Sequence, residues 1–118
     1  MRKLLFIFVL FLASTDGAQK LLHYDLADGL SSSEITSICE NDYYMWIATE
    51  DGLNRFDGHR FKVYKSGKAT NNSLKNNNIE TLFLDSKGLL WIGFKTGGVD
   101  IYNPRTDLFI HLNEQVSE

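Results

Sequence analysis

The strongest constraint on the fold of this chain is an internal repeat. The segment WIATEDGLNRFD begins at Trp46, and the similar segment WIGFKTGGVDIY begins 45 positions further on, at Trp91. The similarity extends to both sides of the two tryptophans. A period of this length is typical of the four-stranded sheets that build β-propellers. We therefore expect consecutive, similar sheets rather than one irregular core.

Each copy contains four short strand candidates separated by turn residues. Apolar and polar residues alternate, and Asn, Asp or Gly stands at each junction, which predicts strands joined by tight turns. No stretch shows the spacing of three and four that an amphipathic helix requires. The predicted fold class is all-β: two four-stranded antiparallel β-propeller blades plus one orphan N-terminal strand, a partial propeller. The strands are predicted at Ile35–Cys39, Tyr44–Thr49, Leu53–Phe56, Phe61–Tyr64, Ile79–Leu84, Leu89–Phe94, Val99–Tyr102 and Leu108–Leu112.

The segment before the first copy supplies the orphan strand. Leu21–Tyr24 is similar in pattern to the last strand of each copy. In a closed propeller, such a leading strand would complete the last blade and lock the ring. The sequence is thus divided into a signal peptide (1–18), a leading strand and linker (19–33), blade 1 (34–66), an inter-blade loop (67–77), blade 2 (78–113) and a tail (114–118).

The first residues have the pattern of an export signal. Arg2 and Lys3 precede the apolar run Leu4–Ala13, and polar residues follow it. This run is shorter than the roughly 20 apolar residues of a membrane-spanning helix. We expect export to the periplasm with cleavage after Gly17 or Ala18. The alternative is an uncleaved membrane anchor.

The two Trp-Ile pairs are interpreted as core residues. A four-stranded blade has two apolar faces and buries neither alone, so bulky residues of one blade pack against the next. The alternative for the tryptophans is a stacking platform for a sugar ring. The predicted structural core consists of Trp46, Ile47, Trp91, Ile92, Phe56 and Tyr102.

The segments DGLSSSEITSI, WIATEDGLNRFDGHRFKVYK and LWIGFKTGGVDIYNP together resemble the two-component regulator propeller repeat. The resemblance covers Leu21 to about Leu112. It implies the periplasmic N-terminal sensor part of a Bacteroidetes hybrid two-component system, whose full-length members carry more repeats, a membrane helix and a histidine kinase. Such sensors respond to oligosaccharides and regulate transcription. Because the sequence stops at Glu118, the resemblance implies a truncated sensor without kinase activity.

Enzymatic interpretations find little support. Asp51, Asp57, Asp85 and Asp100 offer carboxylate pairs of the kind that glycosidases use, but each is interpreted as a turn carboxylate that accepts local backbone N–H groups. The stretch DSKGLLW, at Asp85–Trp91, resembles the Asp-box hairpin of sialidase-like propellers, which is structural. Three His and one Cys residue show no metal-ligand spacing. We predict no catalytic residue, cofactor or metal.

Two other functions stay open. The chain could be a stand-alone exported repeat protein that oligomerises into a ring as a binding or structural module. Less favoured is a fragment of a propeller-type glycan hydrolase. Nucleic acid is not an expected partner, because the net charge is −3 and Lys62, Lys65 and Lys68 form only a short run.

The candidate contact surface lies on one rim of the predicted propeller. Loops on a propeller rim are where ligands usually bind. The candidate residues for an oligosaccharide or a partner protein are Glu50, Asp51, Lys95 and Thr96, beside the inter-blade loop. The other expected partners are further blades, from the parent chain or from other copies. A membrane is expected only through a missing downstream segment.

Overall fold

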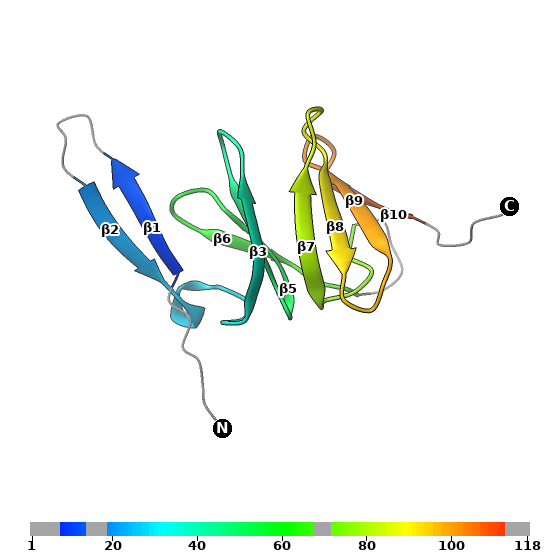
Figure 1. Ribbon diagram of the computed structural model, residues 1–118, viewed down its shortest axis with the longest axis horizontal. Helices are drawn as coiled ribbons and strands as arrows, with labels where there is room; N and C mark the ends of the chain where they lie inside the picture. Colours follow the sequence, from blue (N-terminus) through cyan, green and yellow to red (C-terminus); the bar gives the residue numbers. More distant parts are fainter. Residues whose placement is uncertain (1–7, 14–18, 68–71, 113–118) are drawn as a thin grey trace, which may run out of the picture.

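The computed structural model describes residues 8–13, 19–67 and 72–112. Two four-stranded antiparallel sheets and one two-stranded hairpin stand side by side (Figure 1). Blade 1 has the order β3-β4-β5-β6 and blade 2 the order β7-β8-β9-β10. The prediction of two antiparallel propeller-like blades is confirmed. The elements are β1 (Phe8–Ala13), β2 (Gln19–Tyr24), the 3₁₀-helix η1 (Leu26–Asp28), β3 (Ile35–Glu40), β4 (Met45–Thr49), β5 (Gly52–Phe56), β6 (Phe61–Tyr64), β7 (Ile79–Leu84), β8 (Leu90–Phe94), β9 (Val99–Asn103) and β10 (Leu108–Leu112).

The leading strand β2 is paired, in contrast to the expected orphan. It forms an antiparallel hairpin with β1, which lies inside the predicted signal peptide. The apolar strand β1 thus provides hydrogen-bond partners for backbone N–H and C=O groups that would be unpaired if the edge of β2 were free. The predicted cleavage sites lie outside the described residues; cleavage there would remove β1 and free the edge of β2. Among the described residues, no helix has the length and apolarity needed to cross a membrane.

The end of the leading strand covers the face of blade 1 that points away from blade 2. The Tyr24 ring lies 4.6 Å from the Phe56 ring and 5.8 Å from the Phe61 ring, measured between centroids. Ile47 and Leu30 complete this smaller core. Blade 1 is therefore packed on both faces.

The first strands of the two blades are joined directly. The Thr36 hydroxyl donates to the Ile79 carbonyl over 2.8 Å, and the Leu82 N–H donates to the Ser37 hydroxyl over 3.1 Å. The register slips at the same place in both strands, between Ile35 and Ser37 in β3 and between Ile79 and Thr81 in β7. The shared irregularity shows that the two blades repeat one backbone plan.

The main core lies between the blades. Trp46 is fully buried, and its ring makes an edge contact with the Tyr102 ring at 5.3 Å. Of the predicted core, Trp46, Ile47, Ile92, Tyr102 and Phe56 are buried, whereas Trp91 keeps 36% of its surface exposed. The difference follows from position, because blade 2 covers the Trp46 face and no described strand covers the Trp91 face. Full burial of the tryptophan at this repeat position therefore requires the next blade.

One glycine is required where the β4–β5 turn approaches β6. Gly52 has a φ of 123°, and a Cβ atom at this position would lie 2.9 Å from the Tyr64 carbonyl oxygen. Its N–H also donates to the Asn77 carbonyl over 2.7 Å. A side chain would meet both backbone strain and a steric clash. This close approach ties the turn to the connection between the blades.

Candidate ligand-binding rims

The turns of the two blades form two opposite rims, because successive turns of an antiparallel meander lie at alternate ends of the sheet (Figure 1). We call the first the hairpin rim; it is formed by the turns 41–44, 57–60, 85–89 and 103–107. We call the second the loop rim. It is formed by the turns 49–52 and 94–98 and by the described parts of the inter-blade connection, 65–67 and 72–78.

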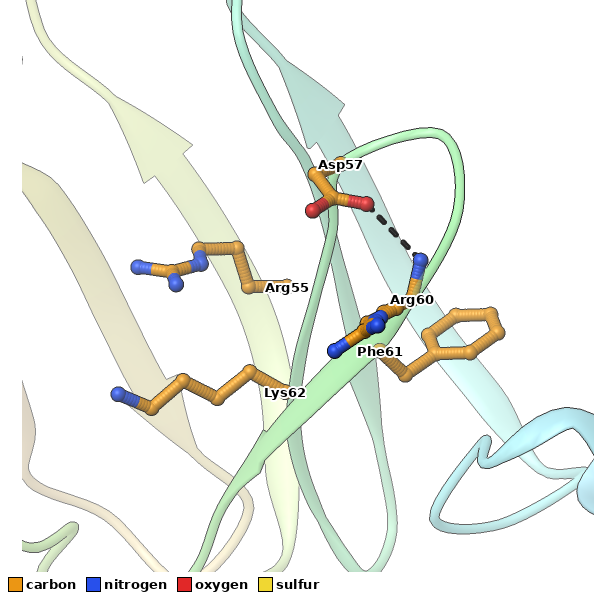
Figure 2. Close-up of a pocket in the computed structure, with 5 residues that line it drawn as sticks. All are labelled: Arg55, Asp57, Arg60, Phe61 and Lys62. Carbon is orange, nitrogen blue, oxygen red and sulfur yellow. Dashed lines mark hydrogen bonds between the residues drawn. The ribbon is translucent and has the colours of Figure 1, made fainter.

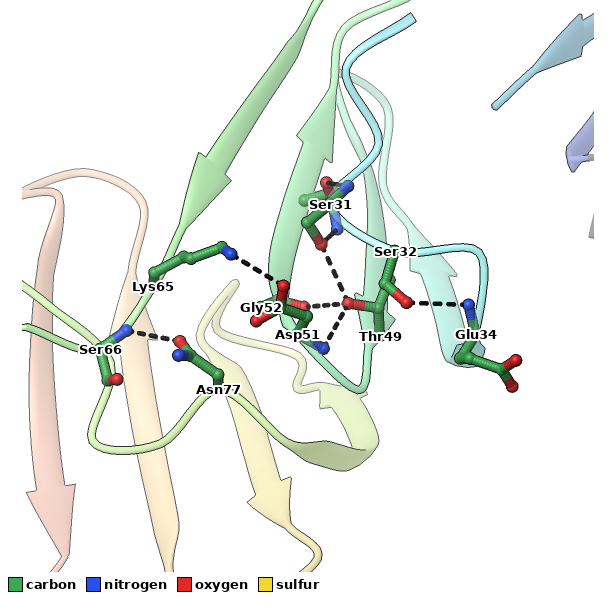
Figure 3. Close-up of polar contacts among 10 residues, drawn as sticks. Ser31, Ser32, Glu34, Thr49, Asp51, Gly52, Lys65, Ser66 and Asn77 are labelled. Atoms are coloured by element: carbon green, nitrogen blue, oxygen red, sulfur yellow. Dashed lines mark hydrogen bonds and ion pairs between the residues drawn. The ribbon is translucent and has the colours of Figure 1, made fainter. Parts of the chain in front are cut away.

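The predicted contact residues of blade 1 lie on the loop rim. The Asp51 carboxylate forms an ion pair with the Lys65 ammonium group over 2.9 Å (Figure 3). The Glu50 N–H donates to the Glu34 carbonyl over 3.2 Å. This ion pair links the β4–β5 turn to the residue that follows β6.

The predicted contact residues of blade 2 lie on the same rim. The Lys95 N–H donates to the Asn78 carbonyl over 3.0 Å, and the Thr96 hydroxyl accepts from the Asn76 amide over 3.3 Å. The structure thus brings all four predicted residues to one rim, where they link turns to loops. A ligand contact at these residues stays a prediction.

A buried amide anchors the loop that enters blade 1. Asn54, on β5, is fully buried. Its side-chain oxygen accepts the Ser31 N–H over 3.0 Å, and its NH₂ group donates to the Ser31 hydroxyl over 2.9 Å and to the Ile47 carbonyl over 3.1 Å. The Ser31 hydroxyl also contacts the Thr49 hydroxyl over 2.9 Å (Figure 3). This network fixes the path of the chain into the blade.

Asp100 occupies the same position in blade 2. It is fully buried on β9, where its carboxylate accepts the Lys75 N–H over 2.9 Å and contacts His111 Nδ1 over 2.6 Å. The interpretation of Asp100 as a turn carboxylate is therefore wrong. Sequence reasoning missed the role of Asn54 and Asp100, although both stand on the third strand of their copy. Aligning the two copies position by position is the signal that would have found them.

A tyrosine network closes the junction between the blades. The Tyr102 hydroxyl donates to Asp107 Oδ1 over 2.6 Å, and the Tyr64 hydroxyl donates to the same oxygen over 3.2 Å. Burial, followed by the hydrogen bond to Asp107, raises the pKa of Tyr102. The hydrogen bond from Tyr102 lowers the pKa of Asp107. The network holds the β9–β10 turn against β6.

The β7–β8 turn on the hairpin rim is built around one carboxylate. Asp85 Oδ1 accepts the N–H groups of Lys87 and Leu89, and Asp85 Oδ2 accepts the indole N–H of Trp91, each over 2.9 Å. The indole bond is the main cause that lowers the pKa of Asp85. This is the structural hairpin that the DSKGLLW stretch predicts. In blade 1, Asn41 accepts the turn N–H groups instead, and Trp46 Nε1 is buried without a hydrogen-bond partner among the described residues.

Replacing Trp91 with phenylalanine should raise the pKa of Asp85 toward the ordinary carboxyl value, because phenylalanine keeps an aromatic ring at this position but has no N–H donor. Since the folded-state pKa is the lowered one, the bond stabilises the fold above the ordinary carboxyl pKa, and this contribution disappears as the pH falls through the lowered value. Carboxyl ¹³C NMR titration measures the change. Asp57, whose pKa is lowered mainly by backbone N–H groups of its own turn, should be unaffected. An unchanged Asp85 titration would contradict the role of the indole.

The larger hollow on the hairpin rim lies between turns of both blades. It has a volume of about 420 Å³. Tyr43 stands beside it with 79% of its surface exposed. The side-chain oxygens of Asn41 and Asn103 accept backbone N–H groups of their own turns, and within the described part of the chain their NH₂ groups donate no hydrogen bond. The lining consists of Asn41, Tyr43, Lys87, Gly88, Leu89, Asn103, Pro104 and Arg105.

A second hollow of about 160 Å³ lies at the β5–β6 turn on the same rim (Figure 2). It is lined by Arg55, Asp57, Arg60, Phe61 and Lys62. Neither hollow contains a residue that the sequence singled out for ligand contact. Within the described ranges, no group of three or more His, Cys, Asp and Glu side chains could hold a metal ion.

The comparisons with known proteins match this geometry. The family described as "Two component regulator propeller" matches residues 29–51 and 73–96. These ranges include the loop that enters each blade and its first two strands. Over 48 residues, which are 40% of this chain and 4% of the relative, the sequence is 42% identical to histidine kinase P4 of Formosa agariphila.

Solved structures with this fold come from Bacteroides thetaiotaomicron. The extracellular domain of the hybrid two-component system BT3049 is 28% identical with a TM-score of 0.72, over 78% of this chain and 13% of that one. Two structures of the BT4673 extracellular domain are 24% and 21% identical, with TM-scores of 0.60 and 0.56. They cover 91% and 94% of this chain and 17% and 18% of theirs, and they support the fold.

The chain thus spans less than a fifth of the length of each of these relatives. It matches the extracellular propeller portion and not a kinase domain. Residues 29–51 and 73–96 are therefore two-component regulator propeller repeats, and the chain is similar to the extracellular domain of a hybrid two-component system.

Proposed function

We propose that this chain supplies two blades of a periplasmic, ligand-sensing propeller in a hybrid two-component sensor, which regulates transcription in response to an oligosaccharide. Export by the N-terminal signal is part of the proposal. The observation that carries it is an apolar row across blade 2. Phe83, Trp91, Ile101 and Ile110 are cross-strand neighbours in register. Phe83 and Ile110 are 63% and 56% exposed.

The equivalent row of blade 1 supports a further blade on this surface. Cys39, Trp46, Arg55 and Lys62 form that row, and Trp46 is buried under blade 2. Large exposed apolar patches mark interaction surfaces in soluble proteins. The blade 2 row therefore fits a next blade, which would bury Trp91 as blade 2 buries Trp46.

The larger hollow on the hairpin rim is the favoured oligosaccharide site. An exposed aromatic ring offers a flat apolar face to a sugar ring, and amide NH₂ groups donate to sugar hydroxyls. Tyr43 and the NH₂ groups of Asn41 and Asn103 supply both. The loop rim is the second candidate, since Asp51 and Thr96 are already engaged with neighbouring side chains.

Replacing Tyr43 with alanine should weaken oligosaccharide binding by about tenfold, because an exposed aromatic anchor is lost. Calorimetric titration of the 118-residue chain with a panel of oligosaccharides measures the effect. Thr96→Ala, on the loop rim, serves as the matched control and should bind as the unsubstituted chain does. If Thr96→Ala weakens binding while Tyr43→Ala does not, the site lies on the loop rim. If no oligosaccharide binds, carbohydrate sensing by these two blades is contradicted.

A stand-alone ring is the second candidate function, since the same apolar row also fits another copy of the chain. Sedimentation analysis separates the two. A closed oligomer of discrete mass would favour the ring, whereas a monomer whose stability rises when further repeats are appended would favour the sensor.

A further inference from the structure

Three cationic side chains line the smaller hollow of the hairpin rim (Figure 2). Arg55 on β5 and Lys62 on β6 are cross-strand neighbours and extend to the same side of the sheet. Arg60 belongs to the turn that joins these strands. Asp57 and Phe61 complete the lining.

The repeat itself does not require charge at these positions. In blade 1, Trp46 is followed across the strands by Arg55 and Lys62. In blade 2, the equivalent row continues from Trp91 to Ile101 and Ile110. Two like charges directly opposite each other destabilise a strand pair, whereas apolar pairs stabilise it. Blade 1 thus carries an energetically unfavourable pair where the same fold accommodates isoleucines.

The neighbouring carboxylates compensate only part of this charge. Asp57 Oδ1 accepts the N–H groups of His59 and Arg60, each over 2.8 Å, and so sets the turn. Arg55 lies over the Tyr44 ring at 4.4 Å, which holds the guanidinium without neutralising it. Among the described residues, the Arg60 guanidinium has no ion-pair partner. The lining holds three cations and one carboxylate, and a second carboxylate, Asp107, interacts with Lys62 and Arg55 from outside it.

The acid nearest to Lys62 is also partly engaged. Asp107 Oδ2 lies 3.7 Å from the Lys62 ammonium group, and Asp107 Oδ1 accepts the hydroxyl of Tyr102. Both side chains of the pair are about half exposed, so the ion pair is weak and can be exchanged for a ligand. Because Asp107 belongs to blade 2, the hollow, which blade 1 alone lines, lies beside a contact between the two blades.

We propose that Arg55, Arg60 and Lys62 form an oxyanion-binding site that takes a carboxylate or sulfate group. Arginine side chains bind such groups through paired, charge-assisted N–H donors. The volume of about 160 Å³ suits a compact charged substituent. The assignment of the oxyanion to an acidic sugar rests on the proposed sensor function. The oxyanion-binding site itself does not depend on that function.

Inorganic sulfate is the first probe. The 118-residue chain is titrated with sulfate at constant ionic strength, with chloride exchanged for sulfate, and the guanidinium N–H signals are followed by NMR. We expect saturable shifts at Arg55 and Arg60. Arg60→Gln should weaken sulfate binding by about three- to tenfold, since one charge-assisted partner is lost, and Lys62→Gln should act in the same direction. Lys75→Gln, whose exposed side chain lies on the inter-blade connection and lines neither hollow, is the matched control and should bind as before. Shifts that do not saturate, or equal affinity in Arg60→Gln, would overturn the site.

Sugar probes identify the source of the oxyanion. Glucuronate carries the carboxylate, glucose 6-sulfate carries the sulfate ester, and glucose is the neutral control. Binding of either acidic sugar with the same dependence on Arg60, and no such dependence for glucose, is the expected result. If sulfate binds through Arg60 but no sugar binds, the site stands and the sugar source is rejected. If neutral oligosaccharides bind through Tyr43 while the affinity for sulfate does not depend on Arg60, the sensor proposal stands and the oxyanion site is overturned.

Discussion

Replacing Trp46 with alanine should abolish cooperative folding of the 118-residue chain. The ring is fully buried between the blades, where it packs against Tyr102 and Tyr64. Truncation of a buried Trp to Ala costs about 3–5 kcal/mol, and small domains have only about 5–15 kcal/mol of stability in total. Urea unfolding followed by circular dichroism, together with the dispersion of amide NMR signals, measures the loss.

The matched control is the same substitution at the equivalent position of blade 2. Trp91 is 36% exposed and donates one hydrogen bond to Asp85. Trp91→Ala should therefore cost about 1–2 kcal/mol in this chain, from partial burial and one surface bond. Equal losses for the two variants would show that blade 2 does not shelter Trp46 as described. When further repeats are appended, the cost of Trp91→Ala should rise toward that of Trp46→Ala.

The strands could be predicted because their signals are local. Alternation and turn residues placed β6 and β7 at their observed bounds, and β3 within one residue. The burial of individual side chains could not be predicted from the pattern, because it depends on tertiary contacts. The two tryptophans have nearly the same sequence surroundings, yet one is buried and the other partly exposed, because burial depends on which neighbouring sheet is present.

The candidate site could be predicted less well, because it is made by packing between elements. The four predicted contact residues do share a rim, as turn positions of consecutive hairpins must. The larger hollow forms where turns of one blade approach turns of the other, and the smaller one lies at the β5–β6 turn of blade 1. No local pattern marks Tyr43 or Arg60 as lining residues. Asp100 was assigned to a turn because Gly98 stands near it in sequence, although the predicted strand Val99–Tyr102 already included this residue.

Replacing Asp100 with alanine should destabilise blade 2 strongly. The change leaves the Lys75 N–H and the His111 ring without their buried acceptor. An unsatisfied buried donor costs about 1–3 kcal/mol, more when the lost partner is charged, so we expect a loss of about 2–4 kcal/mol in urea unfolding. A loss of less than 1 kcal/mol, as is usual for surface changes, would contradict the anchoring role of Asp100.

Blade 1 provides the design for a compensating variant. There, Asn54 pairs across the strands with Ile47 on one side and Val63 on the other, where Asp100 pairs with Ile92 and His111. Asp100→Asn keeps an acceptor for the Lys75 N–H and gains a donor toward the Ile92 carbonyl, as Asn54 has toward Ile47. It should cost only about 1 kcal/mol, chiefly because His111 loses a charged partner. Adding His111→Val removes that unpaired ring and should recover part of the loss. If the double variant is less stable than Asp100→Asn alone, then the buried polar residues of the two blades are not interchangeable. The two blades would then share their backbone structure but not this side-chain network.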